Sequence, residues 1–157
     1  MTAEELIKIL DLKPLAEEGG YYRETYRSTD NEDGKSLATA ILYLLPPDTF
    51  SALHRLPTDE IYHFYLGDSV EMLQLLPNGS GKNIILGQDL EKGEQIQATV
   101  PKGVWQGSKL KAGGKFALMG TTMAPGFDFA DYEAADRNTL IEQYRRYKDL
   151  IVKLTKS

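Results

Sequence analysis

Short, strand-like segments separated by turn residues fill the middle of the chain and restrict it to an antiparallel β architecture. From Gly20 onward, aromatic and β-branched residues recur at every second position, which is the pattern of half-buried strands. Gly, Pro, Asn and Asp interrupt these segments at short intervals. We predict strands near residues 21–26, 38–45, 51–54, 60–66, 70–76, 83–86, 95–100, 107–110 and 115–123. This arrangement is typical of an all-β sandwich or barrel.

Helical patterns occur at both ends of the chain. Thr2 and Glu5 form a capping-box pattern, which predicts a short helix over residues 3–10. Near the C-terminus, large apolar and tyrosine side chains recur at helical spacing, and these are Leu140, Tyr144, Tyr147, Ile151 and Leu154. They predict one longer amphipathic helix over about residues 138–155, packed on the body. A length of 157 residues allows a single domain over residues 1–157, with the barrel over about 20–133.

Composition excludes several classes of function. The formal net charge is -5, whereas a protein that reads the phosphate backbone needs a basic surface, so we expect no nucleic-acid partner. The chain has no cysteine and therefore no disulfide, thiol nucleophile or cysteine-bound metal. The acidic N-terminus lacks the pattern of a signal peptide, so the expected location is cytoplasmic. No apolar stretch approaches the roughly 20 residues of a membrane helix, so we expect no membrane partner.

Two short motifs carry chemical information. In the first, His54, Glu60 and Gly67 have the spacing of His-x-His, a short gap, Glu, six residues and Gly, with Leu56 at the second His position. In the second, residues 101–106 match Pro-x-Gly-x-x-His except that Gln106 replaces the His. These motifs resemble the two motifs of the cupin superfamily.

The flanking residues make the resemblance closer. Residues 19–28 upstream and 124–133 downstream, together with both central motifs, resemble the cupin-5 family over roughly residues 5–135. This family consists of small, largely uncharacterised cupins of the RmlC-like superfamily, described as sugar-epimerase-like. The resemblance implies a double-stranded β-helix, which is a jelly-roll barrel with an internal pocket, and a homodimer.

The resemblance also implies a ligand set for a metal, and this chain departs from it. A full cupin site has three imidazoles and one carboxylate, which suit a divalent transition metal. Here the corresponding set contains His54, Glu60 and the amide of Gln106, while Leu56 has no donor atom. We therefore expect no cofactor. The alternative is a transition metal held by His54, Glu60 and Gln106.

Strand alternation assigns the remaining candidates. In the strand at residues 60–66, Glu60, Tyr62 and Phe64 share one face. If this face points into the barrel, a histidine and a carboxylate meet in a low-dielectric interior, where they suit proton transfer. By analogy with the nucleotide-sugar epimerases of the superfamily, His54 is the general base and Tyr62 returns the proton, with Glu60 beside them.

Other residues are candidates for ligand contact. Arg23 shares a strand face with Arg27 by alternation, and a guanidinium binds a phosphate or carboxylate in a bidentate manner. The alternative for both arginines is pairing with carboxylates at the surface or at a dimer interface. Trp105, next to Gln106, either stacks on a ligand or belongs to the core. The aromatic segment at residues 127–133 either covers the barrel opening or forms the exit from the barrel.

These observations predict a protein that binds a small polar organic molecule, either sugar-like or carboxylated, with His54 and Glu60 at the pocket floor and Gln106 opposite. Phe64 completes the expected contact set beside Arg23, Trp105 and Gln106. The first hypothesis is a metal-independent epimerase or isomerase. The alternatives are a metal-dependent cupin enzyme of dioxygenase or lyase type, and a binding protein without catalysis.

Overall fold

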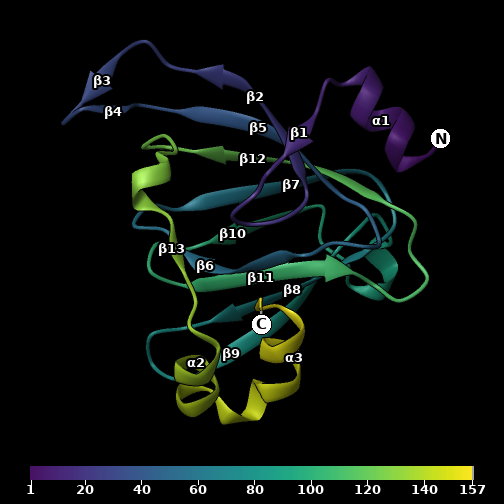
Figure 1. The fold of residues 1–157 in the computed structure, drawn as a ribbon, viewed down its shortest axis with the longest axis vertical. Coiled ribbons are helices and arrows are strands. Elements are labelled where there is room, and N and C mark those ends of the chain that lie inside the picture. The colour runs from purple at the N-terminus through teal and green to yellow at the C-terminus, as the bar shows by residue number, and fades with distance from the viewer. Residues whose placement is uncertain (157) are drawn as a thin grey trace.

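Two facing antiparallel β-sheets form the body of the protein in the computed structural model, which describes residues 1–156 (Figure 1). The larger sheet has the order β1, β2, β5, β12, β7, β10, with bounds Lys13–Pro14, Tyr21–Arg27, Thr39–Leu45, Ala117–Met123, Glu60–Gly67 and Gln97–Val100. The smaller sheet has the order β13, β6, β11, β8, β9, with bounds Glu133–Ala134, Ser51–Arg55, Trp105–Leu110, Val70–Leu75 and Gly81–Leu86. This mostly β, two-sheet jelly roll confirms the expected fold class.

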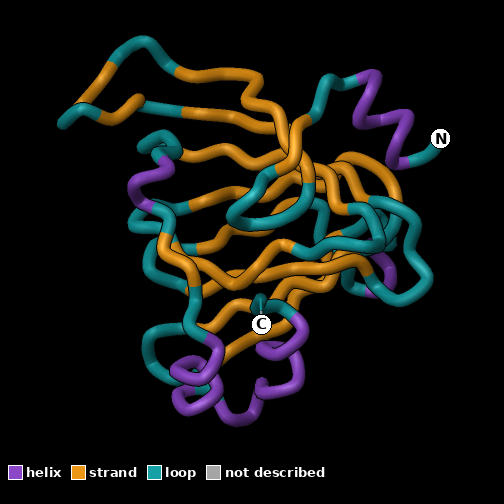
Figure 2. The backbone as a smooth tube through the Cα atoms, in the orientation of Figure 1, coloured by secondary structure: helices purple, strands orange, loops and turns teal. Residues whose placement is uncertain are grey.

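Each of the strand segments predicted from the sequence overlaps a strand of one of these sheets. Besides these, the structure has two-residue strands, including β3 (Asn31–Glu32) and β4 (Lys35–Ser36), which form a small hairpin beyond β2 and β5 (Figures 1 and 2). Segments this short carry no periodicity, so their pattern does not distinguish them from turns.

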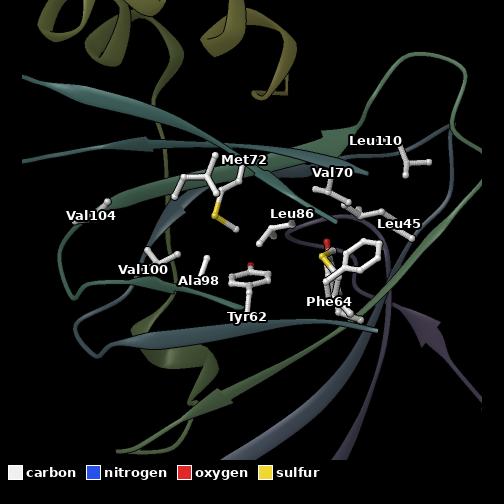
Figure 3. Packing of buried hydrophobic residues seen from close by; sticks show 14 residues of the cluster. Leu45, Tyr62, Phe64, Val70, Met72, Leu86, Ala98, Val100, Val104 and Leu110 are labelled. Atoms are coloured by element: carbon white, nitrogen blue, oxygen red, sulfur yellow. The ribbon is translucent and has the colours of Figure 1, made fainter. Parts of the chain in front are cut away.

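The apolar core lies between the two sheets. Figure 3 shows Tyr62 and Phe64 of β7 facing Met72 of β8 and Leu86 of β9. These side chains are nearly inaccessible to solvent and belong to one cluster that also contains Val70, Val100 and Met119. Burying apolar surface of this kind contributes roughly 25 cal/mol per Å², and it holds the two sheets together.

Helices cover the outer faces of both sheets. α1 (Ala3–Ile9) has the predicted capping box and packs Leu6 with Leu44 and Leu118 of the larger sheet. On the smaller sheet, α2 (Arg137–Gln143) and α3 (Lys148–Lys153) pack against Leu53 and Leu75 (Figure 1). Three 3₁₀ turns are also present, η1 (Leu90–Lys92), η2 (Phe129–Asp131) and η3 (Arg145–Tyr147). Among the described residues, no helix has the length and apolarity needed to cross a membrane.

The C-terminal helix predicted over residues 138–155 is divided into three parts. Tyr144, at the end of α2, has a non-helical backbone with φ -130° and ψ 56°. Its hydroxyl donates to the Leu76 carbonyl at 2.6 Å, and the Tyr147 hydroxyl donates to the Gly81 carbonyl at 2.8 Å. Both bonds attach the segment between α2 and α3 to the β8–β9 hairpin. The predicted side chains still pack on the sheet, although they do so from two short helices and η3.

A tightly held loop at residues 15–20, called here the 15–20 loop, connects β1 with β2 and places Glu18 at the barrel. The Glu18 carbonyl accepts from the Ala52 amide at 2.7 Å, and the Gly19 carbonyl accepts from the Tyr43 hydroxyl at 2.6 Å. Gly19 has φ +103°, and a Cβ at this position would overlap the carbonyl oxygen of Phe50. The loop therefore requires glycine there, both for the backbone conformation and for the close approach.

Substitution of Gly19 tests this requirement. We expect Gly19→Ala to lower the free energy of unfolding by at least about 2 kcal/mol, because a clash with backbone adds to a left-handed penalty of about 1–2 kcal/mol. Gly79→Ala is the matched control, since Gly79 also has positive φ but has open space where the Cβ would lie. Urea unfolding measures both variants. Equal losses in the two would show that Gly19 has no special packing constraint.

Candidate functional site

A cavity of about 150 Å³ opens into the barrel between the larger sheet and the segments that cover its end. β2, β5, β7, β12, the 15–20 loop and the segment around η2 all contribute side chains. The lining residues are Leu15, Glu18, Tyr22, Glu24, Arg27, Thr39, Ile41, Tyr43, Leu56, Glu60, Tyr62, Thr121, Met123, Phe127 and Phe129. The cavity thus has a buried end around Glu60 and Tyr62 and a more exposed end around Arg27 and Phe129.

At the buried end, one glutamine links two side chains of β7. Gln106, on β11 of the opposite sheet, donates from Nε2 to Glu60 Oε1 at 2.8 Å. Its Oε1 accepts from the Tyr62 hydroxyl at 2.9 Å. All three side chains are buried. Buried polar groups are costly without partners, so this chain of hydrogen bonds holds Glu60 and Tyr62 in place and crosses the apolar core between the sheets.

Glu60 is a carboxyl group with altered acidity. Burial raises the pKa of Glu60 above its ordinary value, and the nearby charge of Glu18 raises it further. His54 and the hydrogen bonds from Gln106 and Thr121 act in the opposite direction. The net increase in pKa makes Glu60 a carboxyl group that exchanges its proton closer to neutral pH than an exposed glutamate does.

His54 faces Glu18 inside the barrel. The His54 Nδ1 lies 2.7 Å from the carbonyl oxygen of Ala52. Because a carbonyl oxygen only accepts, we assign the ring hydrogen to Nδ1. Nε2 lies 3.4 Å from Glu18 Oε1 and has no hydrogen-bond partner among the described residues. The two groups are thus close enough to form an ion pair when the imidazole is protonated.

Aromatic hydroxyls surround this pair. Tyr132 stacks on His54 with the ring centroids 4.9 Å apart. Burial raises the pKa of Tyr132, and the charges of Glu18 and Glu17 raise it further. Burial also raises the pKa of Tyr43 well above its ordinary range, with Glu18 as the next cause. These tyrosines therefore remain protonated near neutral pH.

A β-bulge sets which side chains of β2 reach the cavity. Strict alternation predicts that Arg23 and Arg27 share a face, but the register with β5 shifts between Glu24 and Tyr26. Arg27 consequently joins Tyr22 and Glu24 on the cavity face. Its Nη2 donates to Glu24 Oε1 at 2.6 Å and to the Phe127 carbonyl at 2.9 Å. Arg23 is exposed and does not line the cavity, so the structure does not bring it to this site.

Two more expected ligand contacts lie elsewhere. Trp105 is buried on the outer side of the smaller sheet, in the cluster with Leu140 and Ile151, and its ring lies 4.5 Å from the guanidinium carbon of Arg55. It is a packing residue, which was one of the two alternatives. Phe64 points into the barrel but belongs to the apolar core rather than to the cavity lining, and it lies two residues beyond Tyr62 on β7.

His54 and Gln106 reach the site without lining the cavity. His54 contacts Glu18, which does line it, and Gln106 contacts both Glu60 and Tyr62. Of the expected site residues, the structure thus groups His54, Glu60, Tyr62 and Gln106 around one cavity. Phe127 and Phe129 line its exposed end and pack edge to face, with centroids 4.9 Å apart.

The residues at the cupin ligand positions do not suit a transition metal. Leu56 offers no donor atom, although it lines the cavity. The Gln106 oxygen accepts from Tyr62 and its nitrogen donates to Glu60, and a neutral amide oxygen is a poor donor for a transition metal. Within residues 1–156, no three His, Cys, Asp or Glu side chains are grouped so that they could hold a metal ion. One imidazole and one carboxylate remain, whereas such sites use three or more protein ligands.

Four residues that line the cavity were not predicted as site residues from the sequence, and these are Glu18, Tyr22, Tyr43 and Thr121. Glu18 directly precedes the Gly19–Gly20 pair of the upstream motif, and a glycine pair before a strand is a signal for a tight turn. The other three became recognisable only from strand order. Tyr43 and Thr121 lie on β5 and β12, which pair with each other, and Thr121 is opposite Tyr62.

Solved structures with the same fold show which class of protein this is. The protein SO0799 from Shewanella oneidensis has a TM-score of 0.92 and 36% identity, covering 99% of this chain and 98% of that one. A hypothetical protein from Leishmania major has a TM-score of 0.90 and 33% identity, with full coverage of both chains. An oxalate decarboxylase variant from B. subtilis has a TM-score of 0.60 at 16% identity, over 94% of this chain and 39% of the decarboxylase. The fold is that of a cupin.

Sequence comparison gives the family. Residues 4–135 match the family described as Cupin_5, Cupin superfamily (DUF985), and the chain belongs to this family. The uncharacterized protein YML079W from Saccharomyces cerevisiae is 30% identical over 133 residues, which are 73% of this chain. The match spans 66% of the yeast protein, just under two thirds of its length.

The raised pKa of Glu60 gives a pH dependence of stability. Between the ordinary value of 4.5 and the raised pKa, the folded state holds a proton that the unfolded state has released. Stability therefore falls as pH rises through this window, by up to about 1.4 kcal/mol per pH unit. We expect Glu60→Gln to remove this slope and the exposed Glu142→Gln to retain it, as measured by urea unfolding at several pH values. An unchanged slope in Glu60→Gln would contradict the assignment.

A double-mutant cycle tests the link between Gln106 and Tyr62. We expect Gln106→Leu to lower the free energy of unfolding by about 3 kcal/mol, because it leaves two buried groups without partners. Tyr62→Phe and the double variant complete the cycle, with an expected coupling of about 1 kcal/mol or more. Gln97→Leu is the control, since Gln97 is exposed on the neighbouring strand β10. A coupling near zero would show that the two side chains act independently.

Proposed function

We propose that this cupin is a metal-independent isomerase or epimerase that transfers a proton on a small hydroxylated carbonyl compound. One observation carries the proposal. Two groups suited to proton exchange belong to the same cavity, namely Glu60 with its raised pKa and Glu18 paired with His54. Sites in which neighbouring titratable groups are tuned differently are typical of acid–base catalysis.

The Glu18–His54 pair is the base in this proposal. Glu18 lines the cavity, and Ser51 holds its Oε2 by a hydrogen bond of 2.8 Å while Oε1 faces His54 Nε2. The pair takes a proton from the carbon next to the carbonyl group. The electron pair of the broken C–H bond forms a carbon–carbon double bond, and the carbonyl oxygen becomes an enolate oxygen. His54 acts through Glu18, because it does not itself line the cavity.

Glu60 is the acid that returns a proton to carbon. Because its pKa is raised, Glu60 is protonated to a greater extent than an exposed glutamate at the same pH. Return to the same carbon from the other side gives the epimer. Return to the former carbonyl carbon gives the isomer, and the hydroxyl hydrogen on the neighbouring carbon then moves to the enolate oxygen, so that a new carbonyl group forms as the old one becomes a hydroxyl. Tyr62 is less suited to this step, because burial raises its pKa well above the ordinary range and its hydrogen is bonded to Gln106. Tyr62 and Gln106 hold Glu60 in position.

Exchange of substrate hydrogen with solvent tests the proposal directly. In D₂O, we expect the wild-type protein to replace the hydrogen next to the carbonyl of a free aldose or ketose, followed by proton NMR. Dialysis against EDTA leaves the rate unchanged. Glu60→Gln and Glu18→Gln reduce the rate by about 10²–10⁴-fold, the range of a general acid or base. His54→Ala gives a similar loss of exchange. Because His54 is buried, the less disruptive variant His54→Gln checks that the loss does not come from unfolding.

The controls separate the alternatives. Glu142→Gln alters an exposed carboxylate on α2 and retains the full exchange rate. Exchange that disappears with EDTA and returns with a divalent metal would overturn the proposal in favour of metal chemistry. Saturable binding without any exchange would indicate a binding protein and would equally overturn it.

A further inference from the structure

The hydrogen-bonding character of the cavity restricts the chemistry of its ligand. The Tyr43 hydroxyl donates its hydrogen to the Gly19 carbonyl, and the Tyr62 hydroxyl donates to Gln106. Each hydroxyl therefore presents only its oxygen lone pairs to a molecule in the cavity. Glu18 and Glu60 add carboxyl oxygens. These four side chains thus offer oxygen acceptors, beside the hydroxyl groups of Tyr22, Thr39 and Thr121 in the same lining.

The positive charges near the cavity are already paired. Among the described residues that line it, Arg27 is the one cation. Arg27 is bound to Glu24 by two hydrogen bonds of 3.1 and 2.6 Å, and its Nη2 also reaches the Phe127 carbonyl. The His54 imidazole lies behind Glu18. A phosphate or carboxylate on a ligand would leave water without gaining an unpaired cation, which is a costly transfer.

The size of the cavity adds a second restriction. Its volume of about 150 Å³ is below the roughly 300–1,000 Å³ of sites for drug-sized ligands. Apolar and aromatic side chains at the exposed end, including Phe127 and Phe129, offer flat surfaces to a small ring.

We propose that the cavity takes an unphosphorylated, donor-rich polyhydroxy compound of monosaccharide size and rejects its carboxylated and phosphorylated counterparts. The inference rests on the proposed function for the location of the site, and it narrows the substrate class to free sugars and polyols. It argues against nucleotide-linked and acidic sugars. Hydroxyl hydrogens of the ligand meet the oxygens of Glu18, Glu60, Tyr43 and Tyr62.

A matched set of ligands tests the proposal by isothermal titration calorimetry. Glucose, glucuronate and glucose 6-phosphate share one ring and differ in charge, and glucosamine adds a positive charge. At low ionic strength we expect glucose and glucosamine to bind at least about tenfold more tightly than the two anions. A preference for either anion, equal affinity for all four, or no binding of any of them would overturn the proposal.

Variants show whether the cavity carboxylates cause the discrimination. We expect Glu18→Gln to reduce the ratio between neutral and anionic ligands several-fold, because it replaces an anionic acceptor by a neutral amide. We expect Glu60→Gln to reduce the ratio less, because the raised pKa of Glu60 already lowers its negative charge. Glu142→Gln makes the same change of net charge away from the cavity and leaves the ratio unchanged. An equal effect of all three variants would mean that the whole-protein charge, and not the cavity, rejects anions.

The binding experiment tests the ligand class and the exchange experiment tests the isomerase proposal, so either proposal can fail without the other. If glucose binds with the expected selectivity and no hydrogen exchange occurs, the ligand class stands and the isomerase proposal is wrong. If exchange occurs faster on glucose 6-phosphate or glucuronate than on glucose, the isomerase proposal stands and the ligand class is wrong.

Discussion

A buried carboxyl group inside an apolar barrel is the constraint on which this site depends. Glu60 faces inward on β7, where an unpartnered charge would be costly. Gln106, on the opposite sheet, supplies the missing hydrogen-bond partner: its amide donates to Glu60 and accepts from Tyr62. At the position where the cupin motif has a histidine, the amide thus has a different use. It joins the two sheets by a polar link within an otherwise apolar core.

The 15–20 loop contributes the other half of the site. The loop carbonyls of Glu18 and Gly19 accept hydrogen bonds from the Ala52 amide and the Tyr43 hydroxyl, which hold the loop against the two sheets, and Glu18 thereby lies opposite His54. The carboxylate that accompanies the histidine thus comes from a loop far from either cupin motif. Family membership defines the barrel, whereas the pairing of charges inside it depends on this loop and on Gln106.

The strands and the inward direction of Glu60 and Tyr62 could be predicted, because a period of two and the spacing of the first motif report directly on side-chain orientation. Arg27 could not be placed correctly, since an unmarked bulge in β2 reverses the alternation after Glu24. Glu18 has no periodic signal, because its position depends on contacts made across the fold. Tyr144 satisfies helical spacing, but its hydrogen bond to the Leu76 carbonyl interrupts the helix.

The bulge in β2 has a consequence for the divergence of this family. The bulge formed by Thr25, between Glu24 and Tyr26, decides whether Arg27 or Tyr26 faces the cavity. A regular strand that retained Thr25 would therefore exchange a charged side chain for an aromatic one at the cavity entrance, with the amino-acid sequence unchanged. Deletion of Thr25 would instead remove the bulge and keep Arg27 on the cavity face, because Tyr26 and Arg27 would retain their pairing with Ala40 and Thr39. Relatives that accommodate this residue without a bulge would present different chemistry at the cavity entrance.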